Sequence, residues 1–280
     1  DLEEKKGAPA SEDELMTIRN ECKKEVYQEI CHRTGVRLDP DKPTFWKVSR
    51  LVEYKSQYPM LRFLVNILTA DRDKKFTRDE LKAVWLRDIP DLAQEDNRGI
   101  VESVLDKIFK GRDKVNGLGA QIVVGGPVYM DFWDRQFKRW SNEIDDLKGK
   151  FVYVPDSDAK LLKMQAIGSD VCITMPRPLE EACGTSDQRT GLNGGVNISI
   201  KGAGPAEWMI DYDEDTQDGC GFFIGSYTKK TLSGELEADN PKFYNEAPAD
   251  LFDKCETSSR LFYEEGKGKW KHLTHNAYLR

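Results

Sequence analysis

Two basic residues, Arg50 and Lys55, stand five positions apart directly after the short apolar segment TFWKVS (44–49). The segment is typical of a strand, and SRLVEYKSQYPMLRFLVNIL after it predicts a loop followed by a helix. Two cations at a strand end and beside a helix start suit a phosphate or pyrophosphate, because charge-assisted hydrogen bonds add to the field of the helix terminus. Two surface cations without a ligand are the alternative.

The stretch PRPLEEACGTSDQRTGLNGG (176–195) combines glycines and hydroxyl residues behind a pair of glutamates. Its Gly-Thr-Ser run at 184–186 could present backbone N–H groups to an anion, or could form a tight turn that needs glycine for a positive φ. The spacing matches neither GxGxxG nor the Walker A pattern. Glu180 and Glu181 could accept hydrogen bonds from sugar hydroxyls, or could favour a helix start.

The remaining reactive side chains form no recognisable catalytic or metal-binding group. The three histidines are scattered at positions 32, 272 and 275, which gives no visible triad. The six cysteines are widely spaced without a CxxC pair, so we expect reduced, mostly buried thiols and no metal site. The acidic segment DYDEDTQD (211–218) lacks the sixth-position glycine and the distal glutamate of a calcium-binding EF-hand loop, and we interpret it as a solvated loop.

Short apolar segments alternate with helical patterns along most of the chain. After TFWKVS, the predicted strands are QIVVGG (121–126), FVYVP (151–155), VCIT (171–174), VNISI (196–200) and GFFIG (221–225). Continuous apolar strands separated by helices indicate a parallel sheet that is covered on both faces. The predicted fold class is therefore α/β, a doubly wound Rossmann-like sheet, with ligands expected at the carboxyl ends of its strands.

We expect three parts in the chain. Residues 1–35 form an N-terminal helical segment, with a capping box at Ser11 and Glu14 and a closing Gly35. Residues 36–247 form the Rossmann-like domain, which carries a charged helical insertion at 71–118. Residues 248–280 form a C-terminal helical segment.

Composition narrows the classes of partner. The net charge of the 280 residues is −7 and the pI is near 5.3, so nucleic acid is a poor candidate. No segment approaches the roughly 20 apolar residues of a membrane span, and the polar start is no signal peptide, so we expect a cytoplasmic protein. The absence of an initiating Met is consistent with a fragment or a processed product.

The order of SRLVEYK, IVVGGP, FVYVPD, TMPRPLEEACGTSDQRTGLNGG and GFFIG resembles the C-terminal half of an α-glucan (glycogen or starch) phosphorylase, over roughly residues 15–275. That family shows R-x-x-x-Y-K after the first strand, Gly-Gly-Lys after a later one, and E-A-S-G-T-x-x-x-K followed by L-N-G. The resemblance implies a GT-B architecture, in which the active site lies between two Rossmann-like domains. This chain would supply the C-terminal one, so a missing N-terminal GT-B domain or a partner chain is expected.

The resemblance also implies roles for individual residues. Arg50 and Lys55 match the family's contacts to the substrate phosphate. Glu181 matches the carboxylate that binds glucose hydroxyls. Cys183 and Gly184 match positions whose backbone lines the sugar. The implied ligand is thus a sugar phosphate or an α-glucan.

The cofactor positions depart from the family. Thr185 matches a contact to the phosphate of pyridoxal 5′-phosphate, but Arg189 stands where the family's lysine forms a Schiff base with it. A guanidinium with a pKa above roughly 12 supplies no neutral amine for that imine. Pro127 replaces the lysine of Gly-Gly-Lys, and Ser49 replaces a basic residue. We therefore expect no covalent pyridoxal phosphate, although Arg189 can still pair with a phosphate.

Two functions remain open at this point. One is a phosphorylase-like glycosyltransferase domain, a hexosyltransferase that works without the covalent cofactor. The other is a catalytically inactive phosphorylase-like domain that serves as a structural or regulatory subunit of a larger assembly. A generic Rossmann-like nucleotide binder is disfavoured, because no dinucleotide fingerprint follows the first strand.

Overall fold

The computed structural model describes residues 10–155, 158–177, 180–181, 184–225 and 241–280. Its centre is a six-stranded parallel sheet in the order β5-β4-β1-β6-β7-β8. The strands are β1 (Thr44–Val48), β4 (Gln121–Gly126), β5 (Phe151–Pro155), β6 (Val171–Thr174), β7 (Val196–Ile200) and β8 (Gly221–Ile224). Each coincides with a predicted apolar segment, and the doubly wound Rossmann-like prediction is confirmed.

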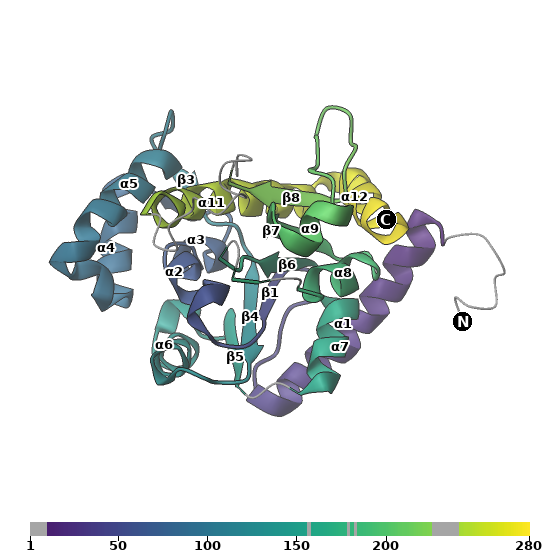
Figure 1. Cartoon of the computed structure of the whole chain (residues 1–280), viewed down its shortest axis with the longest axis horizontal. Helices are drawn as coiled ribbons and strands as arrows, with labels where there is room; N and C mark the ends of the chain where they lie inside the picture. The colour runs from purple at the N-terminus through teal and green to yellow at the C-terminus, as the bar shows by residue number, and fades with distance from the viewer. Residues whose placement is uncertain (1–9, 156–157, 178–179, 182–183, 226–240) are drawn as a thin grey trace.

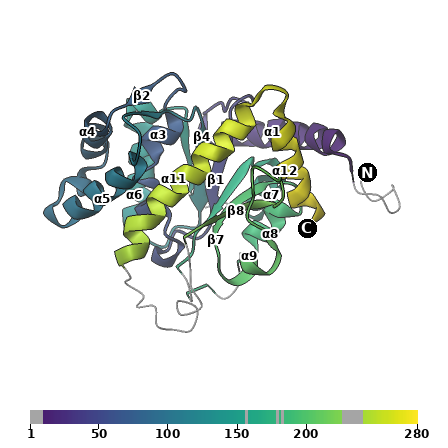
Figure 2. The same cartoon turned by 90° about the horizontal axis from the view of Figure 1, so that it is seen from above.

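Helices cover both faces of this sheet (Figures 1 and 2). On one face, α1 (Glu12–Thr34) and α7 (Ala159–Gly168) bury apolar side chains against β1, β4 and β5. On the other face lie α2 (Gln57–Leu61), α3 (Val65–Thr69), α6 (Asp131–Asn142) and α11 (Pro241–Tyr263). The short α8 (Ser186–Gly191) and α9 (Ala203–Trp208) follow β6 and β7, and α12 (Gly268–Leu279) packs on α1.

Helix ends follow the predicted capping signals. Ser11 caps α1 and forms the expected reciprocal hydrogen bonds with Glu14, and Gly35 ends the helix with a φ of 75°. The C-terminal helical segment differs from the expectation at its start. α11 begins at Pro241, before the expected boundary at 248, and carries Pro248 inside it. Among the described residues, no helix has the length and apolar character needed to cross a membrane.

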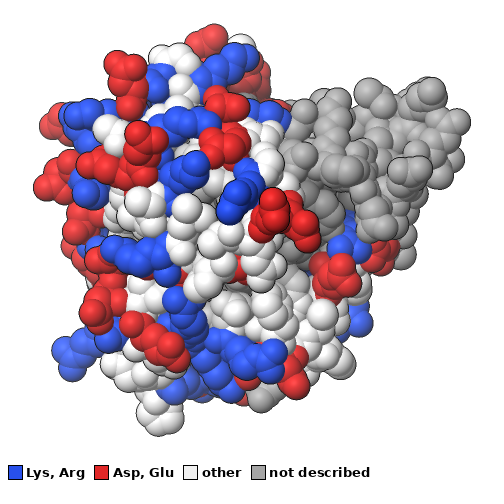
Figure 3. Space-filling model, turned by 90° about the vertical axis from the view of Figure 1, so that its left-hand side faces the viewer, with Lys and Arg blue, Asp and Glu red and all other residues white. Residues whose placement is uncertain are grey.

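The segment 71–118 contains more than helices. It consists of β2 (Lys75–Phe76), α4 (Arg78–Asp88), the 3-10 helices η2 (Pro90–Ala93) and η3 (Glu95–Asn97), α5 (Arg98–Ile108) and β3 (Val115–Asn116). β2 and β3 pair as a small antiparallel sheet that the sequence did not predict. One side of α5 is buried and joins the main core beside α11. Figure 3 shows the surface on the side of α4 and α5, where acidic and basic side chains are intermixed.

The chain reverses its direction of travel across the sheet next to β1. It first runs outward from β1 to β4 and β5, and then returns to build β6, β7 and β8 on the other side. In such a sheet the two sets of loops diverge between β1 and β6, which leaves a crevice at the carboxyl ends of these strands. The topology therefore places the expected ligand site between β1 and β6.

Gly126 fixes the backbone at this edge of the sheet. Its φ is 138°, and a Cβ built there would lie 1.8 Å from the carbonyl oxygen of Ser49. The Ser49 N–H also donates to the Gly125 carbonyl over 3.0 Å. The glycine pair at the end of β4 thus lets the loop after β1 approach closely, and that loop leads to Arg50 and Lys55.

Candidate functional site

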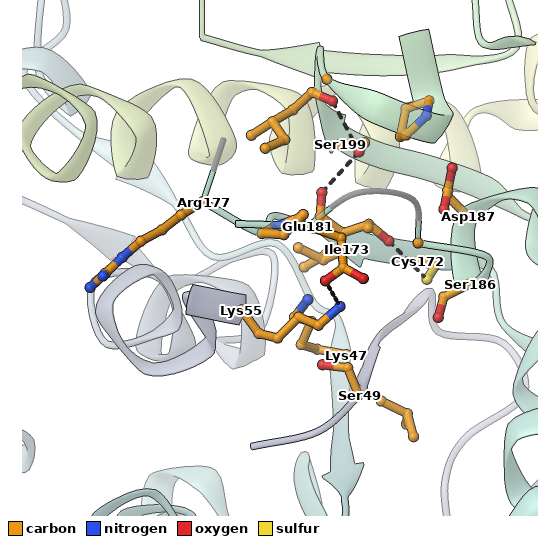
Figure 4. A pocket seen from close by; sticks show the side chains of 17 residues that line it. Lys47, Ser49, Lys55, Cys172, Ile173, Arg177, Glu181, Ser186, Asp187 and Ser199 are labelled. Atoms are coloured by element: carbon orange, nitrogen blue, oxygen red, sulfur yellow. Dashed lines mark hydrogen bonds and ion pairs between the residues drawn. The ribbon is translucent and has the colours of Figure 1, made fainter. Parts of the chain in front are cut away.

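A cavity of about 310 Å³ lies at the carboxyl ends of β1, β6 and β7, at the predicted crevice (Figure 4). Its volume falls at the lower end of the range for small-molecule sites. Apolar walls from Val48, Ile173 and Ile200 alternate with hydroxyl groups and charged side chains. The polar lining residues are Lys47, Ser49, Lys55, Cys172, Thr174, Arg177, Glu181, Ser186, Asp187 and Ser199.

An ion pair between Lys55 and Glu181 crosses the cavity from one loop to another. Both side chains are largely buried, with exposures of 12% and 13%. Lys55 ends the 3-10 helix η1 (Glu53–Lys55), and Glu181 belongs to the loop after β6. The pair thus places a cation and a carboxylate side by side at the cavity.

Arg177 ties the same two loops together. Its backbone N–H donates to the Tyr54 carbonyl over 2.6 Å, and its guanidinium donates to the Glu53 carboxylate over 2.6 Å. Glu53 and Tyr54 belong to η1, so these bonds hold the loop after β6 against the turn that carries Lys55. The position of Lys55 is therefore fixed from both sides.

Lys47 occupies the second-to-last position of β1 and is 3% exposed. Its side chain lies next to Lys55 in the cavity (Figure 4). Burial, together with the positive charge of Lys55, lowers the pKa of Lys47 to about 7. A lysine amine with such a pKa is partly neutral at physiological pH, which an ordinary lysine is not.

Asp187 lies in the first turn of α8 and is fully buried. Its Oδ2 accepts a hydrogen bond from the Trp208 indole over 3.2 Å, and its backbone carbonyl accepts one from the Asn197 side chain over 3.0 Å. Its Oδ1 has no hydrogen-bond partner among the described residues. Burial raises the pKa of this carboxyl, so the cavity holds a carboxyl that favours its protonated form more than an exposed one does.

The structure brings three of the sequence-predicted site residues to the cavity and places others outside its lining. Lys55, Glu181 and Gly184 line it. Arg50 is exposed and donates to the Tyr54 hydroxyl over 2.5 Å, outside the cavity lining. Cys183 lies outside the described residues.

Arg189 and Thr185 are both exposed and do not line the main cavity. The Arg189 Nε donates to the Thr185 carbonyl over 3.2 Å, within one turn of the chain. Arg189 instead borders a small depression between α7 and α8. In this arrangement, neither side chain contributes to the same cavity as Lys55 and Glu181.

Sequence reasoning missed Lys47, Asp187 and the lining residues of β6 and β7. Lys47 gave a signal, because a charged residue inside the strand TFWKV needs a polar environment or a function. Its proximity to Lys55 follows from the turn at η1, which the residue spacing alone does not specify. In the described part of the chain, no three His, Cys, Asp or Glu side chains gather to hold a metal ion.

Comparisons with known proteins give partial sequence matches and a match of the whole fold. The chain is 38% identical to glycogen phosphorylase from Mycobacterium tuberculosis (strain CDC 1551 / Oshkosh) over 63 residues, which are 22% of this chain and 7% of that protein. It is 26% identical to maltodextrin phosphorylase from Thermococcus litoralis over 156 residues, which are 54% of this chain and 17% of that protein. The matches thus span less than a fifth of these relatives' lengths. No family model matches the chain.

Among solved structures, the catalytic domain of starch synthase IV from Arabidopsis thaliana, bound to ADP and acarbose, matches with a TM-score of 0.57. The sequence identity is 16%, and the match covers 97% of this chain and 40% of that one. This likeness shows the fold, a Rossmann-like α/β domain similar to that of a GT-B glycosyltransferase. Together, the comparisons give this chain a GT-B-like fold and a distant sequence similarity to parts of α-glucan phosphorylases.

Proposed function

We propose that the chain is a phosphorylase-like glycosyltransferase domain that binds a sugar phosphate or the end of an α-glucan in the cavity between β1 and β6. The observation that carries this proposal is the Lys55–Glu181 ion pair at the cavity. Lys55 supplies a positive charge for a phosphate, and Glu181 supplies an acceptor for sugar hydroxyls. A sugar phosphate offers both groups on one small molecule.

The lining of the cavity supports a sugar ligand in a second way. Ser49, Thr174 and Ser199 add hydroxyl groups to the lining. The Ser199 hydroxyl donates to the Thr174 carbonyl over 2.9 Å, so its oxygen can only accept from a polyol. Arg50 lies on the surface at the end of the same loop, where its guanidinium donates to the Tyr54 hydroxyl, and the family resemblance implies a phosphate contact for it. We therefore assign Arg50 and Lys55 to the leaving phosphate, whose developing charge they would stabilise.

The same proposal excludes a covalent pyridoxal phosphate at position 189. An arginine cannot form the imine, and the Arg189 side chain is exposed and hydrogen-bonded to the Thr185 carbonyl. The reaction would then rely on electrostatic stabilisation by the protein's own cations. An N-terminal GT-B half or a partner chain would complete the cleft and exclude water from it.

A catalytically inactive phosphorylase-like domain in a larger assembly is the second candidate. Replacements at three cofactor-site positions favour it. Pro127 and Ser49 stand where the family resemblance implies basic residues, and Arg189 stands where it implies the Schiff-base lysine. Such a domain would keep the sugar site and lose the transfer reaction.

One experiment separates the two candidates. The chain, purified together with the N-terminal GT-B half or partner chain that completes its cleft, is incubated with maltoheptaose and either glucose 1-phosphate or ADP-glucose, with and without added pyridoxal phosphate. Elongation of the glucan is followed by mass spectrometry. The transferase proposal predicts elongation that does not depend on pyridoxal phosphate and that Lys55→Met abolishes. Binding of a donor without elongation would support the inactive domain, and elongation only with pyridoxal phosphate would overturn the cofactor-free mechanism.

A further inference from the structure

We propose that Lys47 is a reactive amine that condenses with the carbonyl group of a small hydroxyaldehyde in the cavity between β1 and β6. The inference concerns an amine that the glycosyl-transfer proposal does not use. It rests on the position of Lys47, on the composition of the cavity around it, and on the carboxyl group of Asp187.

The Lys47 amine lies where a ligand can meet it. Only 3% of the residue is exposed, yet it lines a cavity of about 310 Å³ beside Lys55. Among the described residues, its Nζ has no hydrogen bond or ion pair, whereas the neighbouring Lys55 is paired with Glu181. Cys172, Glu181 and Asp187 act on this amine from the same cavity and favour its charged form, but they do not offset its burial and the charge of Lys55. The retention of such a lysine in a central strand calls for a functional explanation.

Charge and burial give this amine nucleophilic character. Desolvation and the positive charge of Lys55 lower the pKa of Lys47 to about 7. A model lysine with a pKa of about 10.4 is neutral in fewer than ~1 in 1,000 molecules at pH 7. Desolvation beside a second cation is a known way to activate a lysine for imine formation.

The surrounding groups select the class of carbonyl compound. Ser49, Thr174 and Ser199 line the cavity with hydroxyl groups, and Glu181 adds a carboxylate acceptor. These groups match the hydroxyls of a short polyhydroxylated chain better than an apolar aldehyde. The volume admits a small molecule of this kind.

The condensation balances without an oxidant or a reductant. The neutral Lys47 amine forms a C–N bond to the carbonyl carbon, and the C=O π electrons move to the oxygen. One proton then passes from the nitrogen to that oxygen, giving a carbinolamine. The hydroxyl then leaves with a proton as water while the nitrogen loses its remaining hydrogen, and a C=N bond is formed. Asp187 lines the same cavity, and its Oδ1 has no hydrogen-bond partner among the described residues. We assign to it the transfer of a proton to the leaving hydroxyl.

The test is reductive trapping on the full chain. Wild-type protein is treated at pH 7 with glyceraldehyde and cyanoborohydride, and modified lysines are located by peptide mass spectrometry. Propionaldehyde, a three-carbon aldehyde without hydroxyls, is the matched probe. The exposed Lys163 on α7 is the internal control. We expect Lys47 to be modified at least ~10-fold faster than Lys163. The neutral fractions of the two amines differ by more than this, but restricted access to the cavity slows the reaction at Lys47.

Three further readouts make the test decisive. Modification of Lys47 should level off above about pH 7.5, whereas an ordinary exposed amine gains reactivity roughly tenfold for each pH unit up to its own pKa. Glyceraldehyde should be preferred to propionaldehyde at Lys47 alone, and Glu181→Gln should reduce that preference. Lys47→Arg, with its folding checked by circular dichroism, should lose the fast site. Modification spread evenly over exposed lysines, with Lys47 untouched, would overturn the proposal.

Discussion

Replacing Lys47 by methionine should stabilise the protein, and the gain should depend on pH. Lys47→Met keeps an unbranched side chain of similar length but removes an amine that lies in a cavity without a paired carboxylate. Keeping that buried amine in its charged form costs free energy in the folded protein. Methionine carries no such cost, and its thioether adapts to irregular space.

The magnitude follows from the pKa. Burial lowers the pKa of Lys47 from 10.5 to about 7, a difference of about 3.5. At about 1.4 kcal/mol for each tenfold change, the charged amine costs at most about 5 kcal/mol. We therefore expect Lys47→Met to gain several kcal/mol at pH 6, up to about 5 kcal/mol.

The sign of the pH dependence is fixed by linkage. Between pH 7 and about 10.5 the unfolded chain binds a proton at Lys47 that the folded chain has lost, so wild-type stability at this residue rises with pH. The penalty is complete below pH 7 and vanishes as the pH approaches 10.5. The advantage of Lys47→Met should therefore be largest at pH 6 and fall to about 1 kcal/mol or less at pH 10.

Urea unfolding of wild type and Lys47→Met at pH 6 and pH 10 measures the gain in the free energy of unfolding and its dependence on pH. The titration of all other groups is common to both proteins and drops out of the difference between them. Lys163→Met is the matched control, because it makes the same chemical change on the exposed face of α7 and should shift the free energy of unfolding by less than ~0.5 kcal/mol. A destabilising Lys47→Met, or a gain that is equal at both pH values, would refute the assignment of Lys47 as a desolvated amine.

Two further predictions concern the backbone and the ion pair at the site. Gly126→Ala should cost about 3 kcal/mol or more in thermal unfolding, because its φ is 138° and its Cβ would lie 1.8 Å from the Ser49 carbonyl oxygen. Gly149→Ala, with a φ of 73° and open space around it, should cost about 1–2 kcal/mol. Equal losses would show that the close approach at Gly126 is not maintained in solution. Lys55→Met and Glu181→Gln should each lower the free energy of unfolding by about 1–3 kcal/mol, which lies between the values for exposed and buried ion pairs. The double variant should lose at least ~0.5 kcal/mol less than the sum of the two single losses. Additive losses would mean that the two side chains do not interact.

The strands were predictable because the apolar signal is strong and local. Each strand of the sheet is a continuous apolar run bounded by turns, and its alternation with helices leaves few topologies. The capping box at Ser11 and Glu14 was equally local, since both hydrogen bonds lie within one turn. By contrast, β2 and β3 have only two residues each, and their pairing depends on contacts between distant segments that no local pattern records.

The site was predictable only in part, for the same reason. The positive charge of Lys55 suggested a phosphate ligand and the carboxylate of Glu181 suggested a sugar. The structure places these two residues at one cavity. That Lys47 lies beside them depends on the turn at η1, and the separation of Arg189 from the cavity depends on the direction of α8. A burial-dependent property such as the lowered pKa of Lys47 has no local signature, because it comes from the atoms packed around the residue.

Isothermal titration calorimetry with glucose 1-phosphate tests the central claim, that the cavity between β1 and β6 is a sugar-phosphate site, most directly. Wild type and Lys163→Met should bind the ligand with the same affinity. Lys55→Met should bind it about 10- to 100-fold more weakly, because one charge-assisted hydrogen bond contributes about 1.5–3 kcal/mol. Wild-type binding that Lys55→Met leaves unchanged, or no binding to the wild type at all, would contradict the account.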